Sequence, residues 1–198
     1  MSHLAETIVS AARALPEGGL LSAKDFLHLA TRAAVDQTLS RLTREGKLMR
    51  VGRGAYAAPM FSRFGARPPS TEAVLKAIES TRGEVIVASG AAEANALGLS
   101  TQVPTREIFL TTGRARKFRL GKRTIEIRHG NRWQMVLGAR PSGKAIRALS
   151  WLGPERAPSA LKMLHTKLPP EEWAAMRSAR SVMPSWMARA ISEVSEHA

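Results

Sequence analysis

The sequence predicts an α+β fold, in which a small N-terminal domain of helices and short strands precedes a mixed α/β region. Three observations predict this fold. Apolar residues recur at helical spacing before residue 46. Two short apolar strands surround a Gly-Arg-Gly tip within 47–57, and apolar and basic residues alternate with a period of two within 106–128. A stretch rich in Pro, Gly, Ser and Arg at 59–70 lies between these patterns.

The length fits one large domain or two small ones, and the composition allows two. The chain has 198 residues, of which 44% are apolar, and this is enough to build a core in each of two domains of about 100 residues. We expect an N-terminal domain at 1–60, a linker at 61–70 and a basic C-terminal domain at 71–198.

The first two helices are predicted from spacing and capping residues. Leu4 and Ile8 lie on one face of a helix spanning about 2–15, and the Pro-Glu-Gly-Gly sequence at 16–19 ends it. Leu20 and Leu21 then form a very short strand. Ser22 precedes a second helix as its N-cap, with Asp25 at the third position of a capping box.

A third helix and a hairpin follow. Val35, Leu39 and Leu42 occupy one stripe at positions i, i+4 and i+7, and Gly46 lies where a left-handed C-cap belongs. Residues 47–57 read as two short apolar strands around a Gly-Arg-Gly tip, which predicts a β-hairpin. The order helix, short strand, helix, turn, helix and hairpin is typical of a winged helix-turn-helix domain, in which the hairpin is the wing.

The C-terminal region mixes strands and helices. A buried strand is expected at 84–88, and two or three strands within 106–128 turn at Gly121-Lys122-Arg123. Period-two alternation in those strands means that one face is buried and the other is positive. Helices are expected at about 71–80, 89–97, 142–152, 169–182 and 185–195.

The charge balance limits the partners. The chain carries 30 Lys or Arg against 16 Asp or Glu, a net charge of +14, which favours DNA, RNA or an acidic membrane surface. The absence of Cys excludes disulfides and thiolate chemistry and fits a cytoplasmic location. With only Asp25 and Asp36, no aspartate cluster for Mg²⁺ is expected. We expect no signal peptide, no membrane span, no metal and no cofactor.

The exposed face of the third helix is the candidate for reading DNA. Gln37 can bond adenine at two points, whereas Arg41 and Arg44 are expected to contact phosphates. Arginines of the hairpin would reach the DNA backbone or the minor groove, although a solvated charged face is the alternative. The predicted DNA-binding residues are Arg32, Gln37, Thr38, Ser40, Arg41, Arg44, Arg50 and Arg53.

A second basic region lies in the predicted strands. Residues 106–147 carry twelve Arg or Lys against two Glu. This excess is expected to extend the DNA footprint or to engage RNA, although the scarcity of exposed aromatics argues against recognition of single-stranded RNA. The second basic patch consists of Arg114, Arg116, Lys117, Arg119, Lys122 and Arg123.

An enzyme is not expected. His129 and Glu126 lie close together in the sequence, but their odd spacing points them to opposite faces of one strand, so they do not form an acid/base pair. Two alternatives remain open beside a DNA-binding regulator: a nucleic-acid-processing enzyme subunit that is targeted by a winged helix, and a basic module that binds an acidic protein.

Four sequence motifs, taken in their order along the chain, resemble one protein family. The pattern from Leu39 to Tyr56, the segment at 89–100, Leu-Thr-Thr-Gly at 110–113 and Ala-Leu-x-Trp-Leu-Gly at 148–153 together resemble abortive-infection (AbiEi-like) antitoxins. The resemblance covers about residues 5–155. It implies a two-domain antitoxin of a type IV toxin–antitoxin system. Its N-terminal domain would bind inverted repeats in its own promoter and repress transcription. Its C-terminal domain would counter a nucleotidyltransferase-like toxin without a stable complex.

Overall fold

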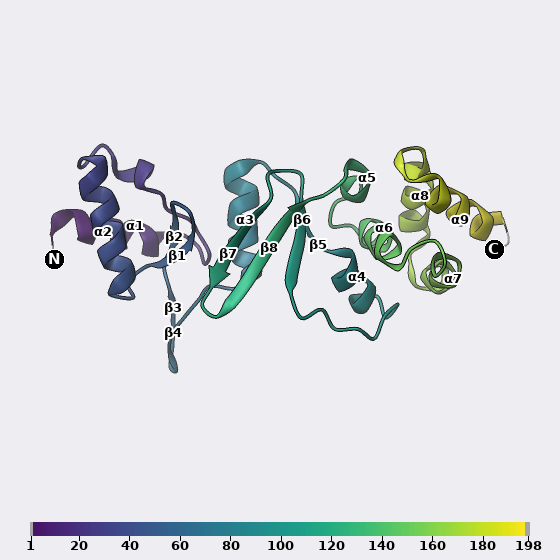
Figure 1. Cartoon of the computed structure of the whole chain (residues 1–198), viewed down its shortest axis with the longest axis horizontal. Helices are drawn as coiled ribbons and strands as arrows, with labels where there is room; N and C mark the ends of the chain where they lie inside the picture. The colour runs from purple at the N-terminus through teal and green to yellow at the C-terminus, as the bar shows by residue number, and fades with distance from the viewer. Residues whose placement is uncertain (1, 197–198) are drawn as a thin grey trace. The chain divides into compact units, whose positions relative to one another are not determined.

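The computed structural model describes residues 2–196, and Figure 1 shows the helices and strands of an α+β protein. The chain forms two compact units. Unit 1 combines Met1–Glu84 with Lys117–Ile125, and unit 2 combines Val85–Arg116 with Glu126–Ala198. The division therefore falls after residue 84, not at the expected linker, and a later segment of the chain returns to unit 1.

Unit 1 begins with the three helical elements that the sequence predicts. They are α1 (His3–Ala14), the 3₁₀ helix η1 (Ala23–Phe26) and α2 (Arg32–Arg44). The second element is a single 3₁₀ turn, shorter than expected, and its capping box is confirmed by a 2.7 Å bond from the Ser22 backbone N–H to the Asp25 carboxylate. The predicted stripe of α2 is also confirmed, because Val35, Leu39 and Leu42 are fully buried.

A bulged hairpin follows α2. Strands β1 (Met49–Gly52) and β2 (Ala55–Ala57) pair antiparallel, with Arg50 opposite Tyr56. Leu21 adds a short bridge to this hairpin, since it exchanges two backbone hydrogen bonds of 2.7 and 2.9 Å with Tyr56. The predicted hairpin is thus confirmed, and the very short strand before η1 pairs with it.

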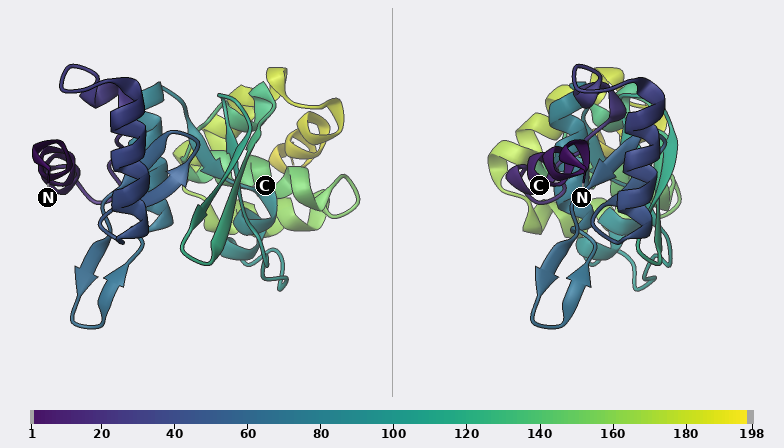
Figure 2. Two further views of the ribbon diagram at one scale, coloured as in Figure 1. Left: turned by 60° about the vertical axis from the view of Figure 1, so that its left-hand side comes forward. Right: turned by 90° about the vertical axis from the view of Figure 1, so that its left-hand side faces the viewer.

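The segment expected as a linker contains a second hairpin. Strands β3 (Met60–Ser62) and β4 (Gly65–Arg67) pair antiparallel, and both figures of the ribbon show this hairpin projecting from the rest of unit 1 (Figures 1 and 2). The Gly-rich and Arg-rich composition that indicates a loop here suits a tight turn with exposed strands equally well.

Hydrogen bonds to Glu17 link the start of helix α3 (Thr71–Arg82) to the turn that follows α1. The Ser70 hydroxyl caps it by accepting from the Ala73 N–H at 3.2 Å. The Glu17 carboxylate accepts hydrogen bonds from the Ser70 N–H at 2.9 Å and from the Arg67 guanidinium at 3.1 Å. These bonds lower the pKa of Glu17, that from the Ser70 backbone most strongly.

A four-stranded sheet has the order β5-β6-β8-β7. Its strands are β5 (Ile86–Ala88), β6 (Glu107–Thr111), β7 (Arg116–Leu120) and β8 (Arg123–His129). In β7 and β8 the predicted alternation of buried apolar and more exposed polar side chains is confirmed. The exposed neighbours are basic in β7, whereas in β8 they include Thr124 and the half-buried Glu126. The buried side chains are Phe118, Leu120, Ile125 and Ile127.

Unit 2 is mainly helical. Its helices are α4 (Gly90–Ala96), α5 (Arg132–Met135), α6 (Pro141–Leu152), α7 (Ala157–Lys167), α8 (Pro170–Ser178), η2 (Ala179–Val182) and α9 (Ser185–Glu196). Helix α4 packs closely on α6, where the buried Arg147 guanidinium donates to the Glu93 carboxylate at 2.9 Å. Among residues 2–196, no helix is long and apolar enough to cross a lipid bilayer.

Candidate nucleic-acid interface

The exposed face of α2 carries most of the residues predicted to contact DNA. Gln37, Ser40 and Arg44 are exposed, on the side opposite the buried stripe. Arg32 is also exposed, but its guanidinium lies 2.8 Å from the Asp36 carboxylate one helical turn later. The face therefore offers polar side chains and cations to solvent, with one arginine already paired.

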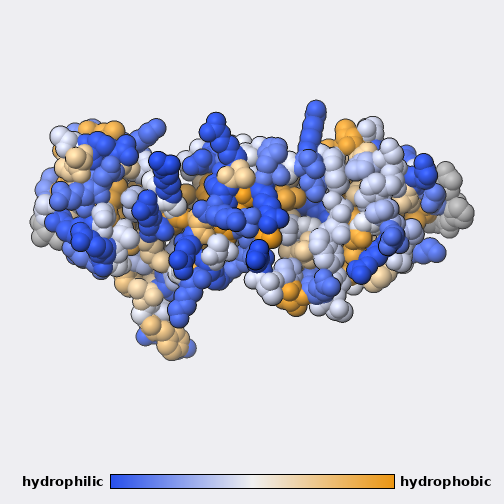
Figure 3. All heavy atoms as spheres, viewed as in Figure 1, coloured by the Kyte–Doolittle hydropathy of each residue, from blue (hydrophilic) through white to orange (hydrophobic). Residues whose placement is uncertain are grey.

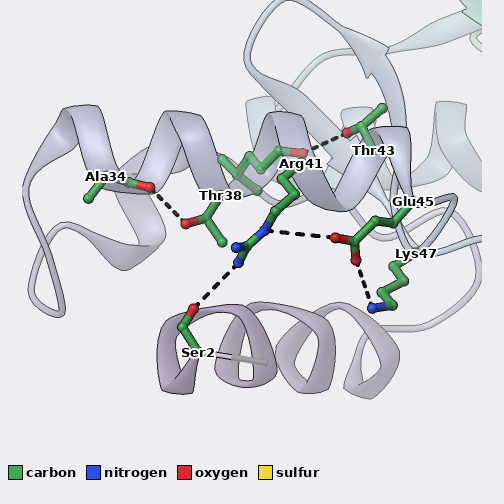
Figure 4. Close-up of polar contacts among 8 residues, drawn as sticks. Ser2, Ala34, Thr38, Arg41, Thr43, Glu45 and Lys47 are labelled. Atoms are coloured by element: carbon green, nitrogen blue, oxygen red, sulfur yellow. Dashed lines mark hydrogen bonds and ion pairs between the residues drawn. The ribbon is translucent and has the colours of Figure 1, made fainter.

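Arg41 lies on α2 and reaches from it to Ser2, the residue before α1. Figure 4 shows its guanidinium pointing toward Ser2 and Glu45. It donates to the Ser2 hydroxyl at 3.4 Å and lies 3.8 Å from the Glu45 carboxylate. Lys47 approaches the same carboxylate at 2.7 Å and contributes most to lowering the pKa of Glu45. Arg41 thus joins two helices in addition to presenting charge.

Thr38 is the predicted contact residue that the structure places in the protein interior. Its side chain is buried, and its hydroxyl donates to the Ala34 carbonyl at 2.8 Å, as Figure 4 shows. Thr38 lies three residues after Val35 and four before Leu42, so it belongs to the same face as the apolar stripe. That spacing is the signal that sequence reasoning overlooked, and we leave Thr38 out of the interface.

The arginines of the β1–β2 hairpin are exposed. Arg53 lies at its tip beside Gly54, whose φ of 70° is in the left-handed region that glycine adopts without strain. Arg50 lies on β1, where its Nε donates to the Gly52 carbonyl at 3.4 Å. The hairpin thus presents two cations to solvent close to its turn.

The second basic patch is divided by the fold. Lys117, Arg119, Lys122 and Arg123 lie in the β7–β8 segment of unit 1, whereas Arg114 and Arg116 lie in unit 2. All six are exposed except Arg116, which is half-buried. The structure therefore brings four cations that the sequence assigns to the C-terminal domain into the unit that holds α2 and the β1–β2 hairpin.

Two close approaches show where the β7–β8 segment lies within unit 1. A Cβ atom added to Gly52 would lie 3.8 Å from the Cβ of Phe118, so β1 runs beside β7. A Cβ atom added to Gly121 would lie 2.9 Å from the Pro68 ring, so the β7–β8 turn touches the end of the β3–β4 hairpin. Hydrophilic side chains cover the β7–β8 hairpin in Figure 3.

The residues considered for catalysis have structural partners. Glu126 and His129 both lie on β8, where Glu126 pairs with Arg128 at 2.9 Å and the His129 ring lies 2.9 Å from the Gly113 carbonyl oxygen. Within residues 2–196, no group of three or more His, Cys, Asp or Glu side chains is placed to hold a metal ion.

Together these features define a basic α+β protein in which α2 and the β1–β2 and β7–β8 hairpins each present exposed cations. The chain belongs to a family of unknown function, DUF6088, whose model matches residues 7–168. Its fold is similar to the crystal structure of the Rv2827c protein from Mycobacterium tuberculosis, with a TM-score of 0.53 and 15% identity over 98% of this chain and 76% of the other. No curated protein matches the chain.

Proposed function

We propose that this chain is a DNA-binding transcriptional autorepressor in which α1, η1, α2 and the β1–β2 hairpin act as a winged helix-turn-helix. The order of these elements supports the proposal, as does the bridge between Leu21 and Tyr56, because a winged helix pairs a short strand with its wing. The observation that carries it is that one compact unit contains the exposed face of α2, the basic β1–β2 hairpin and the basic β7–β8 segment.

Each part has a role on a duplex. An α-helix fits the major groove, where Gln37 and Ser40 would reach base edges and Arg44 a phosphate. Arg50 and Arg53 would contact the adjacent backbone or minor groove from the wing. The cations of the β7–β8 segment would neutralise further phosphates and strengthen binding without reading sequence.

Titration of two variants tests this proposal. The wild-type protein is expected to bind labelled duplexes from the region preceding its own reading frame more tightly than shuffled duplexes of the same composition. Arg53→Ala should weaken binding to both kinds of duplex, because a phosphate contact carries no sequence information. Gln37→Ala should bring the two affinities closer together, since a bidentate contact to a base discriminates by about 1–3 kcal/mol.

Thr38→Val provides the matched control for the helix. The substitution removes a hydroxyl that already bonds within the protein, so both affinities should stay at the wild-type level. Equal wild-type affinity for every duplex would contradict the autorepressor proposal.

We further propose that the protein acts as the antitoxin of a type IV system, on the basis of the resemblance of residues 5–155 to AbiEi-like antitoxins. The counterpart would be a nucleotidyltransferase-like toxin that forms no stable complex with it. Co-expression with a toxin gene found beside its own gene should restore growth, whereas co-purification of the two proteins should fail. Growth arrest that persists despite expression of the folded protein would contradict this role.

A further inference from the structure

The β3–β4 hairpin carries two aromatic side chains that the protein core does not use. Phe61 and Phe64 are 66% and 86% exposed, and no residue of β3 or β4 is buried. Figure 2 shows the hairpin extending from unit 1, and Figure 3 shows apolar colour at its end. Exposing two phenyl rings gives up the free energy that their burial would supply, so a partner that covers them is expected.

Hydrogen bonds of the Ser62 side chain brace the turn that carries Phe64. The Ser62 hydroxyl accepts a hydrogen bond from the Phe64 N–H at 3.2 Å and donates to the Gly65 carbonyl at 3.2 Å. Gly65 has a φ of 99°, which favours glycine at this position of the turn. These contacts fix the backbone on both sides of the ring, so the aromatic side chain is presented with little loss of backbone entropy on binding.

Charge identifies the partner that fits this tip. The Arg63 guanidinium lies 4.7 Å from the centre of the Phe64 ring, and no acidic residue occurs between Met60 and Ser70. A ring accompanied by a cation suits a surface where flat apolar groups lie between anionic groups. Stacked bases flanked by phosphates have this pattern, and base–aromatic contacts are strengthened by a nearby arginine.

The hairpin is long enough for its tip to reach the floor of the minor groove, which at about 6 Å wide admits the side chain at the tip and not the two-stranded ribbon. Three paired residues in each strand span about 10 Å, which exceeds the minor-groove depth of about 7.5 Å. Phenylalanine is among the side chains that proteins insert between base steps from the minor groove, where they partly unstack the bases.

We propose that Phe64 enters the minor groove of bound duplex DNA and inserts between two base pairs, with Arg63 on the neighbouring phosphate. This proposal rests on the proposed DNA binding and adds the β3–β4 hairpin to the elements that contact DNA. Phe61, which lies on β3 before the turn, would flank the groove without entering the base stack.

Fluorescence of 2-aminopurine tests the insertion, because the base brightens when it loses its stacking neighbours. Short duplexes tiled across the region preceding the protein's own reading frame, each with one 2-aminopurine, are titrated with saturating protein. The wild type should brighten the probe at one step. Phe64→Leu, which keeps an apolar wedge, should retain the signal, whereas Phe64→Ala should abolish it and lower affinity about 5- to 100-fold.

Two control variants separate this inference from the proposed function. Phe61→Ala alters an exposed ring of the same hairpin and should keep the 2-aminopurine signal. Arg53→Ala should lower affinity yet keep the signal at saturation. If the wild type binds no duplex, the proposed function fails. If it binds, and Phe64→Ala changes neither affinity nor the probe signal at any step, the inference fails and the proposed function stands. An affinity loss without a probe signal also overturns insertion.

Discussion

At the residue scale, two hydroxyl side chains of α2 show that helical spacing, and not residue type, predicts which side chains are exposed. Thr38 and Ser40 are two positions apart on α2, and both are polar residues able to contact DNA. Thr38 is buried and bonds the Ala34 carbonyl, whereas Ser40 is exposed. A residue type alone could not separate them, but their positions relative to Val35 and Leu42 could, because residues three and four apart share a face.

Glu172 illustrates a residue whose importance only the structure reveals. Its carboxylate accepts hydrogen bonds from the Ser142 hydroxyl at 2.6 Å, from the Ser142 N–H at 3.0 Å and from the Arg140 guanidinium at 2.9 Å. It therefore accepts a hydrogen bond from a backbone N–H at the start of α6 that has no partner within that helix. Glu172 itself lies on a helix thirty residues further along the chain. The sequence shows only a glutamate near the start of a helix, with no sign of its partners.

A pH dependence of stability follows from these contacts. The Ser142 hydroxyl, the Ser142 N–H and Arg140 lower the pKa of Glu172 from 4.5 to about 2. A carboxylate whose pKa is lowered by folding stabilises the protein fully above its ordinary pKa, and this stabilisation is lost as the pH falls through the folded value. The stability gap between the wild type and Glu172→Gln should thus be full at neutral pH and shrink between pH 4.5 and about 2.

Thermal unfolding of both proteins across that pH range measures the gap. Glu171→Gln, which alters an exposed glutamate at the start of the same helix, controls for the removal of a negative charge. A gap between the wild type and Glu172→Gln that stays constant down to pH 2 would contradict the assigned contacts.

At the element scale, local patterns predict more than pairings between distant segments. Helix α2 and the β1–β2 hairpin follow from spacing and turn residues within short windows, and both are observed. The β3–β4 hairpin was missed because its strands are short and bury no side chain, so no alternation marks them. A turn sequence between exposed strands is indistinguishable from a loop when burial supplies no pattern.

The packing of α3 on the turn at 16–19 gives a prediction for this element. Gly18 and Gly83 have φ values of 77° and 63°, so alanine at either position meets the same backbone penalty of about 1–2 kcal/mol. A Cβ atom on Gly18 would also lie 2.5 Å from the Ala73 carbonyl carbon, whereas one on Gly83 would meet open space. Gly18→Ala should therefore destabilise the protein clearly more than Gly83→Ala.

Urea unfolding of the two variants makes the comparison, since both alter the surroundings of the same helix. Equal losses would mean that α3 moves away from the turn without cost, in contradiction to the close contact. A larger loss for Gly83→Ala would reverse the ranking altogether.

At the scale of the whole molecule, the sequence suggests two successive domains, but the compact units are not contiguous. Residues 117–125 belong to unit 1, although the sequence places them well inside the C-terminal domain. The period-two pattern of β7 and β8 predicts two strands but carries no information on which part of the chain they pack against. The exposed residues of α2 and of the β1–β2 hairpin could therefore be predicted from the sequence. That the cations of the β7–β8 segment belong to the same unit could not be predicted.

This arrangement makes a prediction about salt. Each phosphate neutralised on B-DNA contributes about 0.9 to the slope of log affinity against log salt concentration. Replacing Lys117, Arg119, Lys122 and Arg123 with Gln should lower the magnitude of that slope by up to about 3.6 if all four contact phosphates. Affinities measured over a series of salt concentrations give the slope directly.

The matched control alters charge elsewhere. Lys162 and Arg177 are exposed on helices of unit 2, and replacing both with Gln should leave the salt slope of the wild type unchanged. If both sets of substitutions reduced the slope equally per charge removed, the cations would act through overall charge alone, and the β7–β8 segment would have no contact of its own.

The return of residues 117–125 to unit 1 also bears on how such a protein can be divided or inherited. A gene fragment that stops at residue 84 encodes α1 to α3 but omits the strand pair that completes unit 1, and a fragment that starts at residue 85 carries that pair without its packing partners. No single recombination point in the gene therefore separates the two units from each other. The two units are thus expected to pass together from ancestor to descendant.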